Sequence, residues 1–179
     1  MAPNPQPPNM AEYNFVTVWQ FAAPIEPVWA ALTQTEEWPT WWSAVQSVDV
    51  IEPGEPSGIG NISRFIWKTP LGYTLTFETC LVRLEPPTLM EAQAEGEVEG
   101  RGLWELSPLP EGCQVRYTWT VRTTQRWMNW AARLARPLLE WNHNVIMNQG
   151  GAGLARHLNV RLIALESSDR SSLAAPHHP

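Results

Sequence analysis

The stretch FAAPIEPVWAALTQTEEWPTWWSAV, from Phe21 to Val45, places helical spacing between two regions of strand-like sequence. Pro24 stands where a helix can begin, because the residues of a first turn need no backbone N–H. Val28, Trp29 and Leu32 then recur at the spacing of one helix face. The segment TEEWPTWW, with two acidic residues ahead of its tryptophans, predicts a second short helix directly after the first.

Strand-like segments lie on both sides of these predicted helices. Before them, the alternation in YNFVTVWQF, from Tyr13 to Phe21, indicates a strand. After them come six more candidates: SAVQSVDVIE, NISRFIWK, YTLTFETCLVRLE, TLMEAQAEGEVEG, RGLWELSPL and CQVRYTWTVRTT. Because short turns join these segments, we expect one antiparallel sheet of seven strands.

The C-terminal part has helical spacing from about Gln125 to Leu165, with two apolar stripes on nearly opposite faces. One stripe comprises Trp127, Trp130, Ala131, Leu134, Leu138, Trp141 and Val145, and the other comprises Met147, Leu154, Leu158, Leu162 and Leu165. Either Pro137 begins a second helix, or one continuous helix packs against two different surfaces. Gly150, Gly151 and Gly153 disfavour a helix, which predicts close approach of the helix to the sheet or to a ligand there.

The overall composition predicts a single domain. The 179 residues carry a net charge of −6 and show no basic patch, which argues against nucleic-acid binding. We expect the domain to span residues 13–165, between disordered segments at 1–12 and 166–179. There is no secretory signal, and no apolar run approaches the roughly 20 residues that a membrane span needs. The sequence therefore predicts a cytoplasmic protein without stable membrane insertion.

Catalytic and metal-binding motifs are absent from the sequence. It contains no GxSxG, HExxH, glycine-rich phosphate loop or acidic metal cluster, so we expect neither a metal nor a cofactor. Cys80 and Cys113 lack metal-ligand spacing and are expected to be small buried residues, and the sequence leaves a disulfide between them open as the alternative. His143 is the best candidate for acid–base chemistry, because it is in line with the second stripe and an imidazole titrates near neutral pH. The alternatives are a buried, hydrogen-bonded histidine without a chemical role and a histidine exposed on the outside of the protein.

The order of one strand, two short helices, six strands and a long helix resembles the SRPBCC superfamily. This superfamily includes START domains, birch-pollen-type allergens and bacterial polyketide cyclases. The matching segments are the opening stretch, EPP, GRGLWELSP and WNHNVIMNQGGAGLARHL, and the resemblance covers about residues 13 to 165. It implies an α+β helix-grip fold, in which a curved seven-stranded antiparallel sheet wraps around a long C-terminal helix and encloses an apolar cavity. Members resemble one another in shape, but some carry lipids, sterols, quinones or hormones and others cyclise or dehydrate polyketides.

The resemblance and the strand alternation together predict which side chains face the cavity. In such folds the two short helices close one end, so the three tryptophans of WPTWW either seal the core or touch a ligand there. The predicted lining is Trp38, Trp41, Trp42, Phe65, Trp67, Tyr73, Phe77, Trp104, Tyr117, Trp119, His143 and Met147.

Three hypotheses about function follow. The first is binding of a small hydrophobic or aromatic ligand, such as a lipid, quinone or polyketide-like molecule, in the cavity. The second is a cyclase or dehydratase that uses His143 to move a proton. The third is an interaction module, whose Trp127–Trp141 stripe binds a partner protein or a second copy of the chain to form a homodimer.

Overall fold

The computed structural model describes residues 12–123 and 132–169. The order of elements is β1 (Glu12–Phe21), α1 (Ile25–Thr33), η1 (Thr35–Glu37), α2 (Trp38–Trp41), β2 (Val45–Glu52), β3 (Ile62–Lys68), β4 (Thr74–Glu85), β5 (Leu89–Gly96), β6 (Val98–Leu109), β7 (Gly112–Thr123), α4 (Ala132–His157) and β8 (Leu162–Asp169). The strands form one sheet in the order β2-β3-β4-β5-β6-β7-β1-β8, and every neighbouring pair for which a register is defined is antiparallel.

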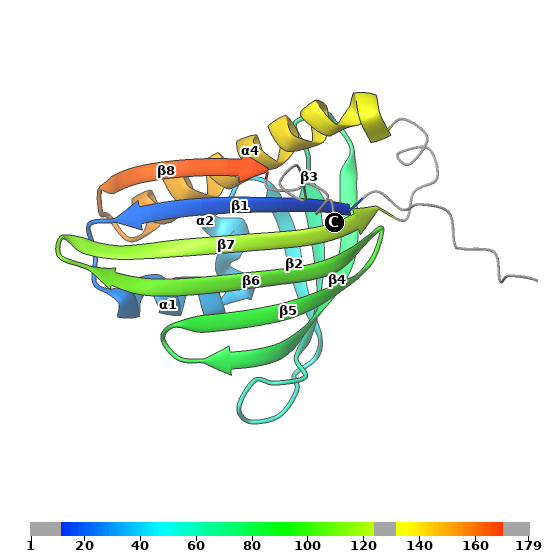
Figure 1. Ribbon diagram of the computed structural model, residues 1–179. Helices are drawn as coiled ribbons and strands as arrows, with labels where there is room; N and C mark the ends of the chain where they lie inside the picture. The colour runs from blue at the N-terminus through cyan, green and yellow to red at the C-terminus, as the bar shows by residue number, and fades with distance from the viewer. Residues whose placement is uncertain (1–11, 124–131, 170–179) are drawn as a thin grey trace, which may run out of the picture.

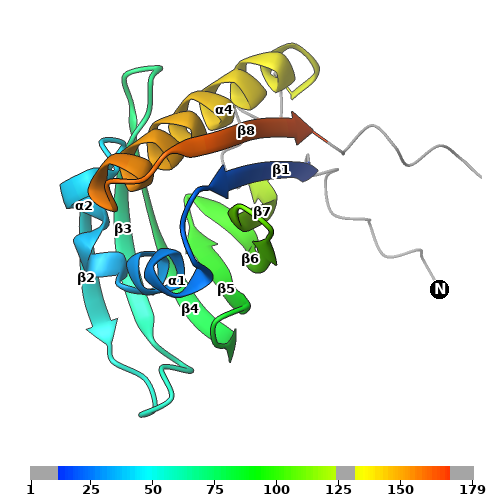
Figure 2. The ribbon, with the colours of Figure 1, turned by 90° about the vertical axis from the view of Figure 1, so that its left-hand side faces the viewer.

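The sheet curves around the helices in a helix-grip arrangement (Figure 1). Helix α4 packs along β8 and β1 and also contacts α2. Seen from the end that α1 and α2 occupy, these two short helices lie within the curve of the sheet (Figure 2). The predicted fold class is therefore confirmed, although the sheet has eight strands where the sequence predicted seven. No helix in the described part of the chain is long and apolar enough to cross a membrane.

The additional strand, β8, replaces the predicted end of the long helix. Helix α4 ends at His157, because Asn159 adopts a left-handed conformation with φ of 52°. The N–H of Asn159 bonds to the carbonyl of Arg156, and the N–H of Val160 bonds to that of Ala155, which is the hydrogen-bond pattern of a Schellman cap. Leu162 and Leu165, predicted on a helical stripe, therefore lie in a strand paired with β1.

Strand β8 also shifts the expected end of the ordered domain. It runs through Asp169, so Glu166–Asp169, which were expected in the tail, are paired with β1 instead. The rest of that tail and the expected N-terminal arm, apart from Glu12, lie outside the described residues. The stripe residues Trp127, Trp130 and Ala131 do as well.

Pro137 lies inside α4 without ending it, so the helix is continuous there and Pro137 does not begin a second one. The outward face of this continuous helix carries Leu138 and Trp141, each 48% exposed. Its inward face carries Met147 and Leu154, which are buried. Leu138 and Trp141, which belong to the first apolar stripe, thus face away from the core.

Two glycines of α4, Gly150 and Gly153, leave room for tryptophans of WPTWW that pack against that helix. A Cβ on Gly150 would press into the indole of Trp42, with Nε1 only 2.9 Å away. A Cβ on Gly153 would overlap the backbone carbonyl of Trp41. The indole of Trp42 is completely buried and donates a hydrogen bond of 2.9 Å to the carbonyl of Ile146. The QGGAG segment therefore fixes how closely α4 approaches α2, which positions Trp42 beside the interior of the sheet.

Candidate functional site

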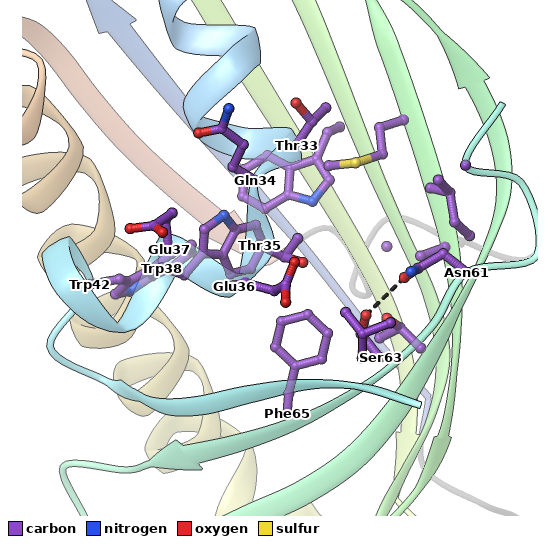
Figure 3. A pocket seen from close by; sticks show the side chains of 18 of the residues that line it. Thr33, Gln34, Thr35, Glu36, Glu37, Trp38, Trp42, Asn61, Ser63 and Phe65 are labelled. Atoms are coloured by element: carbon purple, nitrogen blue, oxygen red, sulfur yellow. Dashed lines mark hydrogen bonds between the residues drawn. The ribbon is translucent and has the colours of Figure 1, made fainter. Parts of the chain in front are cut away.

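A large cavity opens between the short helices and the concave face of the sheet. Its volume is about 620 Å³, within the range typical of small-molecule sites. Figure 3 shows the turn from Thr33 to Glu37 on one side of it, with Asn61, Ser63 and Phe65 across from that turn. The full lining comprises Thr33, Gln34, Thr35, Glu36, Glu37, Trp38, Trp42, Val50, Gly58, Asn61, Ser63, Phe65, Trp67, Phe77, Thr79, Leu81, Leu84, Met90, Ala92, Gly102, Trp104, Tyr117 and Trp119.

Aromatic rings form the inner wall of this large cavity. Trp104 stacks on Tyr117 with ring centroids 4.0 Å apart, and Tyr117 stacks on Trp119 at 6.1 Å. On the opposite strands, Phe65 stacks on Phe77 at 5.7 Å. Such offset, nearly parallel rings present flat apolar faces, against which a planar ligand can pack.

Polar groups also line the large cavity. The hydroxyl of Ser63, which is buried, donates to the side-chain oxygen of Asn61 at 2.8 Å, and Thr79 lies near them on the neighbouring strand. The exposed residues Glu36 and Glu37 line the cavity from the turn that precedes α2. The large cavity therefore combines an aromatic inner wall with a small buried polar group and exposed carboxylates.

A second, smaller cavity of about 130 Å³ lies between α4 and the sheet. We call it the small chamber, and its lining comprises Tyr13, Phe15, Trp67, Tyr73, Leu75, Phe77, Val98, Tyr117, Trp119, Val121, Leu139, Asn142, His143, Ile146 and Met147. Four aromatic residues line both cavities and therefore stand between them: Trp67, Phe77, Tyr117 and Trp119. We call these four residues the aromatic partition.

His143 lies in the wall of the small chamber. Its ring stacks on Phe15 with centroids 4.5 Å apart, and its Nε2 is 3.3 Å from the hydroxyl of Thr17. That hydroxyl is in turn 3.2 Å from the hydroxyl of Ser167 on β8. Thr17 is only 1% exposed and lines neither cavity, so this polar chain leads from the chamber wall into the buried contact between β1 and β8.

Two of the three tyrosines that line the small chamber, Tyr73 and Tyr117, are neutral at physiological pH because the pKa of each is raised. Burial raises the pKa of Tyr117 far above its ordinary value of 10.0, because the phenolate would lose its hydration. Burial also raises the pKa of Tyr73, and the nearby carboxylate of Glu97 adds to the effect. Both hydroxyls therefore remain protonated and act as neutral hydrogen-bonding groups.

The structure brings eleven of the twelve predicted lining residues to the two cavities. Trp38, Trp42, Phe65 and Trp104 line the large cavity, Tyr73, His143 and Met147 line the small chamber, and the four residues of the partition line both. Trp41 lines neither, because its ring stacks on Trp42 at 5.5 Å and is buried between α2 and α4. Of the two roles that the sequence left open, sealing the core or touching a ligand, the buried position of Trp41 fits the first.

Sequence reasoning missed several lining residues. On β4 and β5 it missed Leu81, Leu84, Met90 and Ala92. On α4 it missed Leu139, Asn142 and Ile146, which share the inward face with His143. The spacing of three and four residues between Leu139, Asn142 and Ile146 was the available signal, but the more apolar stripe of Leu138 and Trp141 obscured it. In the described part of the chain, no group of three or more His, Cys, Asp or Glu side chains is placed to hold a metal.

Comparison with known proteins places the chain in a family. The family described as polyketide cyclase / dehydrase and lipid transport matches residues 14–158. A comparison with curated proteins finds no match.

Solved structures share the fold. The di-domain ARO/CYC StfQ from the steffimycin biosynthetic pathway is 17% identical with a TM-score of 0.63, covering 83% of this chain and 52% of that one. TTHA0849 from Thermus thermophilus is 17% identical with a TM-score of 0.65, covering 82% and 99% of the two chains. Ara h 8.0201 is 15% identical with a TM-score of 0.57, covering 81% and 99%.

These structural similarities establish the fold of this chain. The present chain spans about half the length of the two di-domain proteins it resembles, StfQ and BexL. The family match, in contrast, covers nearly all of the described residues up to the end of α4. The protein belongs to the polyketide cyclase / dehydrase and lipid transport family.

Proposed function

We propose that this protein binds a small, hydrophobic, ring-bearing molecule in the large cavity. The observation that carries the proposal is a space of about 620 Å³ whose inner wall consists of stacked aromatic rings. Burial of apolar ligand surface supplies the favourable free energy, at roughly 25 cal/mol per Å² removed from water. Flat rings match the faces of the stacked pairs Trp104–Tyr117 and Phe65–Phe77 better than a flexible acyl chain does.

The polar groups of the lining limit how such a ligand can be oriented. Ser63 and Asn61 already bond to each other, but each retains further hydrogen-bonding capacity, since a hydroxyl and an amide offer several sites. A ligand with its rings against Trp104 could direct its polar substituents toward these groups. Quinones and polyketide-like molecules fit this arrangement of rings and oxygens.

Binding is a better-supported function than acid–base catalysis by His143. Its Nε2 lies beside the Thr17 hydroxyl, and its ring is stacked on Phe15, so the contacts on these two sides position the residue in the wall. These contacts favour a ligand-binding role over the cyclase or dehydratase alternative.

The test compares two variants of β5 that add the same indole to opposite faces. Ala92 lines the large cavity, whereas the adjacent Gln93 is exposed. We expect wild-type protein to bind 2-naphthol with one site in isothermal titration calorimetry, Ala92→Trp to weaken binding at least about tenfold by filling the space, and Gln93→Trp to bind as wild type. Absence of saturable binding to the wild type, or unchanged binding to Ala92→Trp, would refute the proposal.

A further inference from the structure

The small chamber contains a buried hydrogen-bond acceptor that no described residue satisfies. Asn142 is only 6% exposed, its side chain lines the chamber, and its Oδ1 has no hydrogen-bond partner among the described residues. A buried acceptor without a donor is unfavourable, and native structures contain few of them. The amide oxygen of Asn142 is therefore suited to accept a hydrogen bond from a molecule that enters the chamber.

The aromatic partition contributes a second unsatisfied group. Trp67 lines both cavities, and its buried Nε1–H has no acceptor within the described chain. Its ring is fixed by edge contact with Trp42 at 4.9 Å and by stacking near Phe77 at 6.4 Å. An indole N–H is a donor only, so the wall between the cavities offers a donor and the chamber beyond it offers an acceptor.

The charge and size of the chamber restrict what can fill it. Among the described residues, its lining includes no Asp, Glu, Lys or Arg, and burial keeps Tyr73 and Tyr117 neutral, so a charged group would enter without an ionic partner there. A volume of about 130 Å³ is close to the roughly 150 Å³ of an apolar protein cavity that binds benzene. The chamber thus fits one neutral six-membered ring.

A hydroxyl group matches both unsatisfied atoms. Its O–H can donate to Asn142 Oδ1, and its lone pairs can accept from an N–H such as that of Trp67. A ketone or ether oxygen offers no donor and would leave Asn142 Oδ1 unsatisfied. We propose that the small chamber is a subsite for a hydroxylated ring of the ligand, with Asn142 Oδ1 accepting the hydroxyl hydrogen.

This assignment rests on the proposed function, because the remaining rings of the ligand would occupy the large cavity. The two spaces share the faces of Trp67, Phe77, Tyr117 and Trp119, so one planar ligand reaching past these rings contacts both. The ligand class is then a fused-ring or multi-ring compound with a phenol-type hydroxyl at its inner end. Asn142 becomes the residue that determines specificity for that hydroxyl.

The test uses three probes with the same ring system: 2-naphthol, 2-methoxynaphthalene and naphthalene. Their dissociation constants are measured by calorimetry for the wild type, for Asn142→Leu, and for the matched control Asn148→Leu, which changes an exposed residue of the same helix. Comparing the naphthol-to-ether ratio between variants cancels the intrinsic difference in hydrophobicity between the probes.

We expect the naphthol-to-ether preference to fall by about 3- to 10-fold in Asn142→Leu, the range for one neutral hydrogen bond, and to be unchanged in Asn148→Leu. Naphthalene should bind Asn142→Leu about as well as the wild type, which also shows that the variant is folded. Leu139→Trp, which removes the space instead of the acceptor, should lower the same preference.

The outcomes separate this inference from the proposed function. If all three probes bind the wild type but Asn142→Leu and Leu139→Trp both keep its naphthol preference, the subsite is refuted and the binding function stands. If no probe binds the wild type, the binding function is refuted and the subsite with it. A water molecule that merely fills the chamber would give the first of these results, because a ligand would then gain nothing from Asn142.

Discussion

Replacing the glycines of α4 by alanine tests the packing that positions Trp42 beside the large cavity. In an ordinary helix, alanine is favoured over glycine by about 1 kcal/mol per position, so each substitution alone should stabilise the protein. At Gly150 the new methyl would instead press into the buried indole of Trp42. The two effects have opposite signs, and the structure indicates which is larger.

The steric effect outweighs the propensity at Gly150. Carbon atoms pack favourably at about 3.5–4.0 Å, whereas the new Cβ would lie 2.9 Å from Trp42 Nε1 and closer still to the ring carbons. Overpacking a tight core costs about 1–3 kcal/mol. Moving the indole would also break its bond to Ile146, at about 1 kcal/mol more. After subtracting the propensity gain, we expect Gly150→Ala to lose roughly 1–3 kcal/mol.

The neighbouring glycines complete an internally controlled series. A Cβ on Gly151 would lie 3.0–3.2 Å from its three nearest atoms, all in the side chains of Trp19 and Leu165, so a small shift should suffice and the net change should stay within about 1 kcal/mol of zero. A Cβ on Gly153 would overlap the Trp41 carbonyl, so the backbone of α2 must shift and the loss should at least equal that of Gly150→Ala.

The assay is equilibrium unfolding in urea, followed by tryptophan fluorescence and circular dichroism. The predicted order of stability is Gly151→Ala above Gly150→Ala, with Gly153→Ala no higher than Gly150→Ala. Because Trp42 lines the large cavity, Gly150→Ala should also weaken binding of 2-naphthol. A Gly150→Ala protein as stable as the wild type would refute the packing described above.

Two further predictions concern pH dependence and the outer face of α4. Burial, with a smaller contribution from Glu26, raises the pKa of Cys113 from 9.0 to about 11, so its contribution to stability is complete below pH 9 and decreases by about 2–3 kcal/mol as pH rises toward 11. Between about pH 8 and about pH 10.5, the unfolding free energy measured in urea should therefore fall more in the wild type than in Cys113→Ala. An equal fall in the two proteins would contradict this prediction. Trp141→Glu should change the unfolding free energy by less than about 0.5 kcal/mol and leave 2-naphthol affinity unaltered, because this half-exposed indole lines neither cavity. Size-exclusion chromatography of the same variant tests pairing through the outer stripe: that hypothesis requires an oligomeric wild type and a monomeric variant.

Most of the sheet was predictable from the sequence because alternation and turn residues are local signals. Alternate residues of a strand point to the same face, so one inward residue on β6 or β7 predicts the others on that strand. Trp104, Tyr117 and Trp119 were predicted in this way. Strand β8 was missed because Leu158, Leu162 and Leu165 also fit helical spacing. The deciding feature was Asn159, whose left-handed conformation ends α4; asparagine favours this conformation, but the apolar spacing that continues across it obscured the signal.

The facing of α4 was the harder part of the site to predict. An inward helix face is usually the more apolar one. In α4 the inward face carries Asn142, His143 and glycines, because it borders a cavity and buried indoles that need room. The apolar residues Leu138 and Trp141 face outward instead. The unsatisfied amide of Asn142 therefore becomes visible only when the cavity and the helix are placed together.

The most direct test of ligand binding in the large cavity uses the indole N–H signals of the eleven tryptophans as local probes. In ¹⁵N-labelled protein, single Trp→Phe variants assign these signals, and 2-naphthol is then titrated. Binding in the cavity predicts saturable shifts of the Trp38, Trp67, Trp104 and Trp119 signals, all from lining residues, with Trp141 unmoved. Shifts confined to Trp141, or no saturable shift of the cavity indoles, would contradict the central claim that this protein holds a ring-bearing ligand inside its sheet.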